Sequence, residues 1–241
     1  MNDDPRRLEN IDVVRWIAVQ DAAALRREAY RRIVDCADRA IGERGEFRIV
    51  LSGGNTPRGV YRMLRGAETD WARWQVYFGD ERCLSVEDPE RNSRMAGETW
   101  LDHIPIARGN VHVIPGELGA DAAAQAYAAL LRSVENFDLV LLGLGEDGHT
   151  ASLFPGHDYG DAAGAPDTLA VLEAPKPPQQ RVSLSAARLS RAREILFLVE
   201  GENKRDAVMR WRAGENLPAA AIRAQCGIDV LIDSCSLPQA V

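Results

Sequence analysis

The sequence has few aromatic residues and few cysteines, and neither a membrane span nor a signal peptide is evident. Aromatic residues make up 6% of the 241 residues, so we expect an aliphatic core. No apolar run approaches the roughly 18 residues that a membrane span needs, and the first ten residues lack the apolar segment of a signal peptide. The cysteines are Cys36, Cys83, Cys226 and Cys235. None are spaced as C-x-x-C or as a zinc site, which favours a cytoplasmic protein with reduced thiols, not bound to a membrane.

The chain also lacks an excess of positive charge. It has 29 Lys and Arg against 36 Asp and Glu, a formal net charge of −7. This balance argues against nucleic-acid binding, which depends on Lys and Arg contacts to phosphates. It does not exclude a small anionic ligand, because a few cations gathered in one cleft can outweigh the average field.

Several catalytic patterns are missing as well. The glycine-rich turn over 52–56 fits neither Walker A nor G-x-G-x-x-G, and the sequence contains no serine in G-x-S-x-G and no H-E-x-x-H or other metal-like histidine cluster. No cysteine lies in a motif that suggests a nucleophile.

The chain does contain apolar runs that alternate with amphipathic segments. We expect strands over 13–19, 46–52, 74–80, 111–115, 137–145, 193–201 and 227–233, with weaker candidates over 168–175 and 180–186. We expect helices over 21–43, 57–64, 121–134 and 203–211, and a long Pro- and Gly-rich loop over 156–181. Such alternation predicts one α/β domain, residues 1–241, built on a mainly parallel sheet flanked by helices.

A glycine-rich turn follows the second expected strand. Its residues are Ser52, Gly53, Gly54, Asn55 and Thr56. Pro57 then opens a helix, a position that favours proline. Glycines allow close approach of a ligand, and a helix N-terminus offers free N–H groups to an anion. The alternative is an ordinary strand-to-helix turn.

Charged residues follow the strand expected over 74–80. Asp80, Glu81 and Arg82 come at its end, where α/β proteins bind ligands. Arg82 can hold a phosphate or carboxylate through its planar guanidinium. The alternative is a solvated cluster of surface charges.

His149 lies just past the apolar run of residues 139–142, among glycines and acids. A histidine with a pKa near ~6.5 can take and return a proton at neutral pH. Asp147 or Glu146 could orient its imidazole, and a loop histidine without a catalytic role is the alternative. The remaining histidines have no motif around them and are expected to be structural or surface residues: His103, His112 and His157.

Two further cations stand at the ends of expected elements. Arg181 opens a strand and Lys204 opens a helix. Side chains at such positions can clamp a phosphate, although a solvated helix turn is the plainer interpretation of Lys204 and its neighbour Arg205.

Taken together, these segments resemble the 6-phosphogluconolactonase family, which is related to glucosamine-6-phosphate deaminase and ribose-5-phosphate isomerase. The resemblance covers residues 10–233. It is carried by LSGGNTP (51–57), GDERCLSVEDPERNSRM (79–95), GLGEDGHTASLFPG (143–156), RVSLS (181–185) and GENK (201–204). In one place the chain departs from the family, because the turn after D-E-R often carries prolines and here reads CLSVEDPER.

The resemblance implies a Rossmann-like α/β fold and hydrolysis of a sugar-phosphate lactone without nucleotide, cofactor or catalytic metal. It implies that His149 is the acid/base. Asp147 and Asp80 are the candidate catalytic acids beside it, and which of them orients the imidazole stays open. The residues implied to bind substrate are the loop 52–56, Arg82, Asn92, Arg181 and Lys204, with the three cations at the phosphate end. A monomer or weak homodimer is expected.

Two alternatives remain. A sugar-phosphate deaminase or isomerase would use an acid aligned with Asp80 to take a proton from carbon. Arg82 and the sequence DGHTASLFPG disfavour it, because deaminases tend to have an aromatic residue after D-E and D-G-H-I-A-F-N-E downstream. A catalytically silent sugar-phosphate sensor is the other alternative, and its relatives carry a DNA-binding segment for which little sequence precedes the first expected strand.

Overall fold

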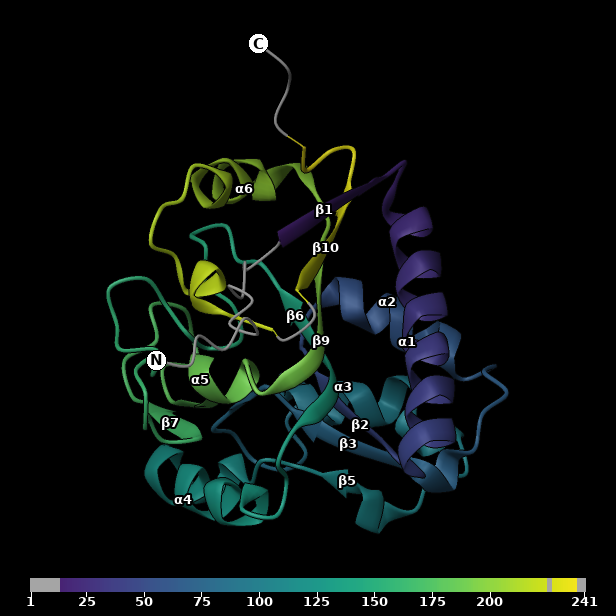
Figure 1. Ribbon diagram of the computed structural model, residues 1–241. Helices are drawn as coiled ribbons and strands as arrows, with labels where there is room; N and C mark the ends of the chain where they lie inside the picture. Colours follow the sequence, from purple (N-terminus) through teal and green to yellow (C-terminus); the bar gives the residue numbers. More distant parts are fainter. Residues whose placement is uncertain (1–13, 225–226, 238–241) are drawn as a thin grey trace, which may run out of the picture.

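Unbroken apolar runs form a central sheet of seven parallel strands (Figure 1). The computed structural model describes residues 14–224 and 227–237. The sheet order is β1–β10–β9–β6–β2–β3–β5. Its strands are β1 (Val14–Val19), β2 (Phe47–Leu51), β3 (Trp74–Phe78), β5 (Val111–His112), β6 (Phe137–Gly143), β9 (Ala192–Val199) and β10 (Ile228–Asp233). The predicted α/β class with a mainly parallel sheet is therefore confirmed.

Helices cover both faces of this sheet. The α-helices are α1 (Ala22–Arg44), α2 (Asn55–Leu64), α3 (Asn92–Thr99), α4 (Ala120–Leu131), α5 (Ala186–Leu189) and α6 (Arg205–Arg212). Short 3-10 turns are η1 (Trp71–Arg73), η2 (Leu101–His103), η3 (Arg108–Asn110), η4 (Gly116–Leu118), η5 (Glu202–Lys204) and η6 (Pro218–Ala221). Figure 1 shows α1, α2 and α3 on one side of the central strands and α4, α5 and α6 on the other.

The longest helix, α1, begins and ends where its sequence predicts. The Asp21 carboxylate accepts a hydrogen bond from the Ala24 N–H at 2.7 Å, a cap that contributes about 1 kcal/mol. Gly45 ends the helix with φ 79°, a left-handed conformation that favours glycine. Apolar residues at four-residue steps, Leu25, Ala29 and Ile33 among them, are fully buried against the sheet.

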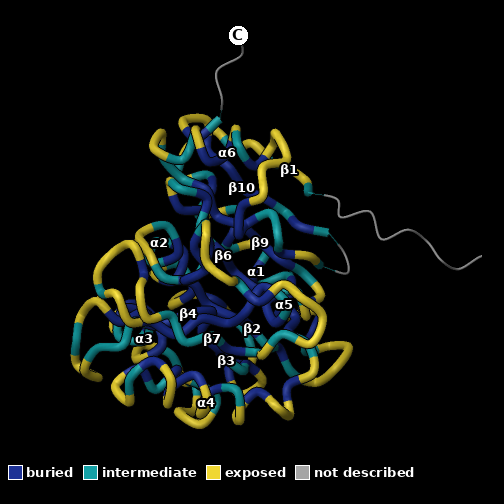
Figure 2. Tube along the Cα trace, turned by 90° about the vertical axis from the view of Figure 1, so that its left-hand side faces the viewer, coloured by how far each residue is buried: buried dark blue, intermediate teal, exposed yellow. Residues whose placement is uncertain are grey.

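Burial is concentrated in the central strands. Figure 2 shows them as a dark-blue interior enclosed by exposed loops. The residues of β6 from Phe137 to Leu142 are all buried, as expected of a strand covered on both faces. Among the described residues, none of the helices has the length and apolarity to span a bilayer.

The order in which successive strands join the parallel sheet reverses between β2 and β6. From β2 the sheet grows toward β3 and β5, whereas β6 pairs with the opposite edge of β2 and continues toward β9. In open α/β sheets the loops that leave the two strands at such a switch point diverge and form a crevice at the carboxyl ends. Residues 52–56 follow β2, and the loop containing His149 follows β6.

A second, antiparallel sheet of three strands stands beside this crevice. Its order is β4 (Asp80–Arg82), β8 (Arg181–Leu184) and β7 (Thr168–Val171). Asp80 faces Ser183 and Arg82 faces Arg181 across the β4–β8 pair. Because side chains alternate along a strand, these four residues share one face, and Glu81 points to the other.

Some boundaries differ from those expected from the sequence. The strand expected over 74–80 ends at Phe78, because Gly79 donates to Leu51 O at 2.9 Å and accepts from Leu184 N at 2.7 Å, which redirects the chain into β4. The segment 156–181 was expected to be mainly a loop, with a weaker strand candidate over 168–175, and it contains β7 at Thr168–Val171. Helix α3 was not predicted. The start of the first expected strand, Val13, lies outside the described residues, as does Cys226; the cysteines that are described are free.

Candidate active site

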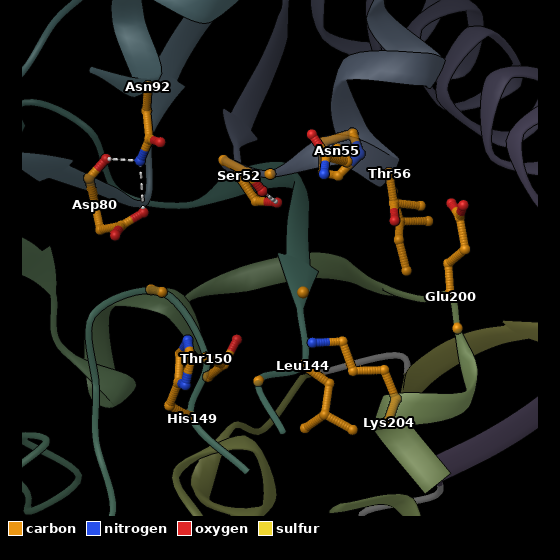
Figure 3. A pocket seen from close by; sticks show the side chains of 18 of the residues that line it. Ser52, Asn55, Thr56, Asp80, Asn92, Leu144, His149, Thr150, Glu200 and Lys204 are labelled. Carbon is orange, nitrogen blue, oxygen red and sulfur yellow. Dashed lines mark hydrogen bonds between the residues drawn. The ribbon is translucent and has the colours of Figure 1, made fainter. Parts of the chain in front are cut away.

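A pocket of about 450 Å³ occupies the crevice at the carboxyl ends of β2 and β6 (Figure 3). It brings together segments that are far apart in the sequence. Its lining includes Ser52, Gly53, Gly54, Asn55, Thr56, Asp80, Arg82, Asn92, His149, Arg181 and Lys204. All the predicted substrate-binding residues therefore meet there, together with two of the three predicted catalytic residues; Asp147 lies outside the lining.

The loop after β6 forms a tight turn around His149. The Gly145 N–H donates to His149 O at 2.7 Å, and the Gly148 N–H donates to Gly145 O at 3.0 Å. Gly148 has φ 90°, which a residue with a side chain rarely adopts. A Cβ added to Gly145 would lie 2.0 Å from His149 Nδ1. The glycines of this loop therefore let the imidazole lie directly against the backbone.

Asp147 lies behind the imidazole and is hydrogen bonded to it. Its Oδ1 is 2.5 Å from His149 Nδ1 and also accepts the His149 backbone N–H at 3.2 Å. Because an ionised carboxylate can only accept, this contact assigns the proton to Nδ1 and leaves the Nε2 lone pair available as a base.

The electrostatic surroundings keep His149 neutral. Burial lowers the pKa of His149 below its usual value, and the Asp147 carboxylate only partly offsets that effect. Burial acts in the opposite direction on Asp147, but its hydrogen bond and charge interaction with His149 prevail and lower the pKa of Asp147. The pair is thus a neutral imidazole beside an ionised carboxylate near neutral pH.

The other candidate acids have different partners. Glu146 accepts a hydrogen bond from Asn203 Nδ2 at 2.6 Å and so belongs to the edge of the pocket near Lys204. Asp80 accepts from Asn92 Nδ2 at 3.0 Å and from Ser152 Oγ at 2.6 Å. Its negative charge nevertheless reaches His149, where it favours the protonated imidazole. Asp147 is therefore the acid that orients the ring, and Asp80 acts on it at longer range.

The glycine-rich turn after β2 is held from two sides. The Tyr61 hydroxyl accepts the Ser52 N–H at 3.1 Å and donates to Ser52 O at 2.8 Å. A Cβ on Gly53 would lie 2.1 Å from Asn92 Oδ1, so Asn92 packs directly against this glycine. Helix α2 begins at Asn55 without a side-chain cap, which leaves its first N–H groups available to an anion at this end of the pocket.

Two guanidinium groups lie opposite each other on the small sheet. Arg82 donates to the backbone carbonyl of Glu90, and its Nε is buried without a hydrogen-bond partner among the described residues. Arg181 donates through Nε to Pro178 O at 3.0 Å, and through a terminal nitrogen to Lys176 O at 2.9 Å and Pro177 O at 3.1 Å. Arg181 therefore anchors the loop before β8, a contact that sequence reasoning did not anticipate.

Within the part of the chain that the structure describes, neither arginine forms a direct ion pair with a carboxylate. Burial lowers the pKa of Arg181, Asp80 partly offsets this, and Arg82 adds repulsion. Lys204 extends from η5 with its amine directed into the pocket (Figure 3), and burial lowers its pKa despite the nearby Glu146. Three cations, Arg82, Arg181 and Lys204, thus gather in one cleft of an acidic protein, whose lining also holds Asp80 and Glu200.

Some lining residues were missed by sequence reasoning. They include Thr150, Glu200 and Asn203. Glu200 follows β9, the strand next to β6, and accepts a hydrogen bond from Arg26 at 2.6 Å. Its position after the carboxyl end of a strand could have marked Glu200 as a pocket residue. That inference requires knowing that β9 lies next to β6, which the sequence does not give. Within the described ranges, no group of three or more His, Cys, Asp and Glu residues could hold a metal ion.

Comparison with known proteins identifies relatives along most of the chain. Residues 20–231 match the family of glucosamine-6-phosphate isomerases/6-phosphogluconolactonase. A 6-phosphogluconolactonase of Synechocystis sp. is 39% identical over 208 residues, 81% of this chain and 85% of that protein. Another, from Streptomyces coelicolor, is 34% identical over 249 residues and covers 95% of each.

Solved structures agree with the sequence relatives. The 6-phosphogluconolactonase of Thermotoga maritima matches with a TM-score of 0.85 at 25% identity, over 92% of this chain and all of that one (100%). A monomeric glucosamine-6-phosphate deaminase shares the fold, with a TM-score of 0.78 at 22% identity over 92% of this chain and 98% of that one. The resemblance found in the sequence is confirmed, and the chain belongs to the glucosamine-6-phosphate isomerase/6-phosphogluconolactonase family.

Proposed function

We propose that this protein is a 6-phosphogluconolactonase, which hydrolyses 6-phospho-D-glucono-1,5-lactone to 6-phospho-D-gluconate in the oxidative pentose phosphate pathway. The observation that carries the proposal is the His149–Asp147 pair, 2.5 Å apart, at the edge of a pocket that also holds three cations. The relatives named 6-phosphogluconolactonase, which align with most of the chain, support it.

His149 is the general base and acid of the proposed reaction. Its Nε2 takes a proton from water as the water oxygen attacks the lactone carbonyl carbon. When the tetrahedral intermediate collapses, the bond from that carbon to the ring oxygen breaks, and the same proton passes from Nε2 to the leaving oxygen. Acid–base assistance of this kind contributes about 10²–10⁴-fold to the rate.

The two carboxylates assist His149 in different ways. Asp147 holds the imidazole in the Nδ1–H tautomer, and both Asp147 and Asp80 stabilise the imidazolium that forms during attack. Backbone N–H groups of the glycine-rich loops are the proposed donors to the developing oxyanion. No cofactor or metal is part of the proposal.

The phosphate is bound by the positive part of the pocket. Arg82, Arg181 and Lys204, together with residues 52–56 and Asn92, hold the substrate so that its carbonyl carbon meets His149. Binding energy at the phosphate, remote from the reacting carbon, is used in this way to orient the lactone.

We further propose one lactonase domain over residues 1–241, located in the cytoplasm and present as a monomer or weak homodimer. The large and small sheets share one core in the described residues, with Val182 and Leu184 of β8 packed into the same cluster as β6. Sedimentation or size-exclusion measurements at several concentrations test the assembly state.

The decisive experiment is a lactonase assay on freshly prepared 6-phosphogluconolactone, corrected for spontaneous hydrolysis. The parent protein should accelerate hydrolysis, and His149→Ala should lose most of kcat with a much smaller change in KM. Turnover of glucosamine-6-phosphate in place of the lactone would identify a deaminase. Binding of the sugar phosphate without turnover would identify a sensor, and near-parental turnover by His149→Ala would contradict the role of the histidine.

A further inference from the structure

Glu81 is fully buried although both of its sequence neighbours line the pocket. Its exposed fraction is 0%, and alternation along β4 directs its side chain away from the face that carries Asp80 and Arg82. It does not line the pocket. A buried carboxylate is costly unless hydrogen bonds and an opposite charge surround it, so its partners indicate what it does.

The Glu81 carboxylate joins strand β4 to the first turn of α3. Its Oε1 accepts the N–H groups of Arg82 at 2.8 Å and Asn92 at 2.7 Å. Its Oε2 accepts the Ser93 N–H at 2.9 Å and the Ser93 hydroxyl at 2.6 Å. One oxygen atom thus holds the backbones of two pocket residues that are ten positions apart in the sequence.

The same carboxylate acts as the cap of α3. Arg91, at the N-cap position, supplies no side-chain cap bond. Glu81 supplies the acceptor instead, and its negative charge lies at the positive end of the helix dipole. The start of α3, and with it the position of Asn92, therefore depends on a residue of another element.

Arg91 balances the buried charge from the other side. Its Nε lies 3.5 Å from Glu81 Oε2, while its terminal nitrogens donate to Glu117 at 2.7 Å and to Ile114 O at 2.8 Å. Arg91 is 1% exposed, whereas the Glu117 side chain is 36% exposed. Glu117 thus shares Arg91 with Glu81, but among the described residues the bonds of its side chain reach neither β4 nor α3.

Displacement of Asn92 would disturb two other pocket residues, Asp80 and Gly53. Its side-chain amide donates to Asp80 O at 2.9 Å and to Asp80 Oδ1 at 3.0 Å, and it packs on Gly53. We propose that Glu81 is a positioning residue of the active site, which fixes Arg82, Asn92 and, through Asn92, Asp80. This inference rests on the proposed lactonase function.

The test compares Glu81→Gln with the matched control Glu117→Gln. Both variants replace a carboxylate that contacts Arg91, but only the first removes an acceptor from the Arg82, Asn92 and Ser93 groups. At matched folded fractions, verified by thermal melting, Glu81→Gln should lower kcat/KM by about tenfold or more and weaken calorimetric binding of 6-phosphogluconate. Glu117→Gln should stay within about twofold of the parent, because its carboxylate bonds to Arg91 and, among the described residues, to no residue that lines the pocket.

Glu81→Asp separates position from charge. It keeps the negative charge but is one methylene shorter, so it cannot reach both N–H groups of Arg82 and Asn92. Loss of activity similar to that of Glu81→Gln supports positioning, whereas parental kcat/KM overturns it, as does an equal loss in Glu117→Gln. If Glu81→Gln does not fold, Glu81→Asp and Ser93→Ala decide in the same way, and parental activity in both overturns the proposal.

Failure of the proposed lactonase function can be told apart from failure of the positioning role of Glu81. If the parent does not hydrolyse the lactone, the lactonase proposal is contradicted. Binding of 6-phosphogluconate to the parent and to the Glu81 variants then decides the positioning role alone, because that measurement requires no turnover.

Discussion

Gly145→Ala should disable His149 by displacing its imidazole. An added Cβ would lie 2.0 Å from Nδ1, 2.2 Å from Cε1 and 2.6 Å from Cγ of the imidazole. Ordinary contact begins at 3.4 Å, so the ring has to retreat by the difference from the nearest atom, about 1.4 Å. Such a movement breaks the 2.5 Å contact with Asp147 and takes Nε2 away from the position where it meets the attacking water.

The expected loss follows from that distance. A misplacement of about 1 Å at a catalytic group costs about 10²-fold in rate, equivalent to about 2.7 kcal/mol of barrier. The phosphate-binding residues are untouched, so KM should change little. Crowding of a packed loop costs about 1–3 kcal/mol of folding free energy, a shift in Tm of several degrees that leaves the protein folded at 25 °C.

The assay measures kcat and KM on fresh lactone together with thermal melting. Gly42→Ala is the control, because nothing lies within 4 Å of its added Cβ. Gly42 is in the last turn of α1 and does not line the pocket. It should keep parental kinetics and gain about 0.5–1 kcal/mol of stability. A Gly145→Ala variant with parental kcat would refute the catalytic placement of His149.

Three more outcomes are expected. Because burial lowers the pKa of His149 and the neutral ring is the active form, the acid limb of kcat/KM should have its midpoint below ~6.5, and an acid limb above ~6.5 would contradict the assignment. The same shift leaves folding unaffected above ~6.5 and destabilises the folded state as the pH falls below that value, because the unfolded chain then binds the proton more readily. Asp147→Asn should move the limb to still lower pH, since Asp147 raises the pKa of His149, and should reduce kcat by about 10²–10⁴-fold; an unmoved limb would exclude the pair. Lys204→Ala should raise KM for the phosphorylated lactone far more than for the unphosphorylated one, and an unchanged preference in steady-state kinetics would remove it from the phosphate site.

Local patterns were sufficient to predict the parallel sheet. The run 137–145 has no alternation, which predicts a strand buried on both faces, and β6 has that environment. Helix α1 has a capping residue and an apolar stripe within its own sequence, so local residues determine its boundaries.

Elements that depend on distant partners were not predictable in this way. Helix α3 is capped by Glu81, which precedes Asn92, the first residue of the helix, by 11 positions, and no local side-chain cap marks its start. Strand β7 was only a weaker candidate, because it lies in a segment rich in proline and glycine and depends on pairing with β8. The chain redirection at Gly79 requires hydrogen bonds from β2 and β8.

The candidate site likewise has features that local sequence predicts and features that depend on tertiary contacts. The pattern around His149 indicated a proton-transfer role and left open which acid assists it, because sequence spacing does not specify side-chain directions. The structure places Asp147 at the ring, and engages Asp80 with Asn92 and Ser152. Arg181 was predicted from its place at a strand end, but its bonds to the carbonyls of residues 176–178 depend on how that loop folds back.

Arg82 and Arg181 face each other across the β4–β8 pair of the small sheet. Like charges directly across an antiparallel pair oppose its formation, so β4 and β8 pair against this repulsion. On the proposed function, a dianion bound between the two guanidinium groups would replace repulsion with attraction. Substrate binding would then also stabilise the small sheet that forms part of its own binding site.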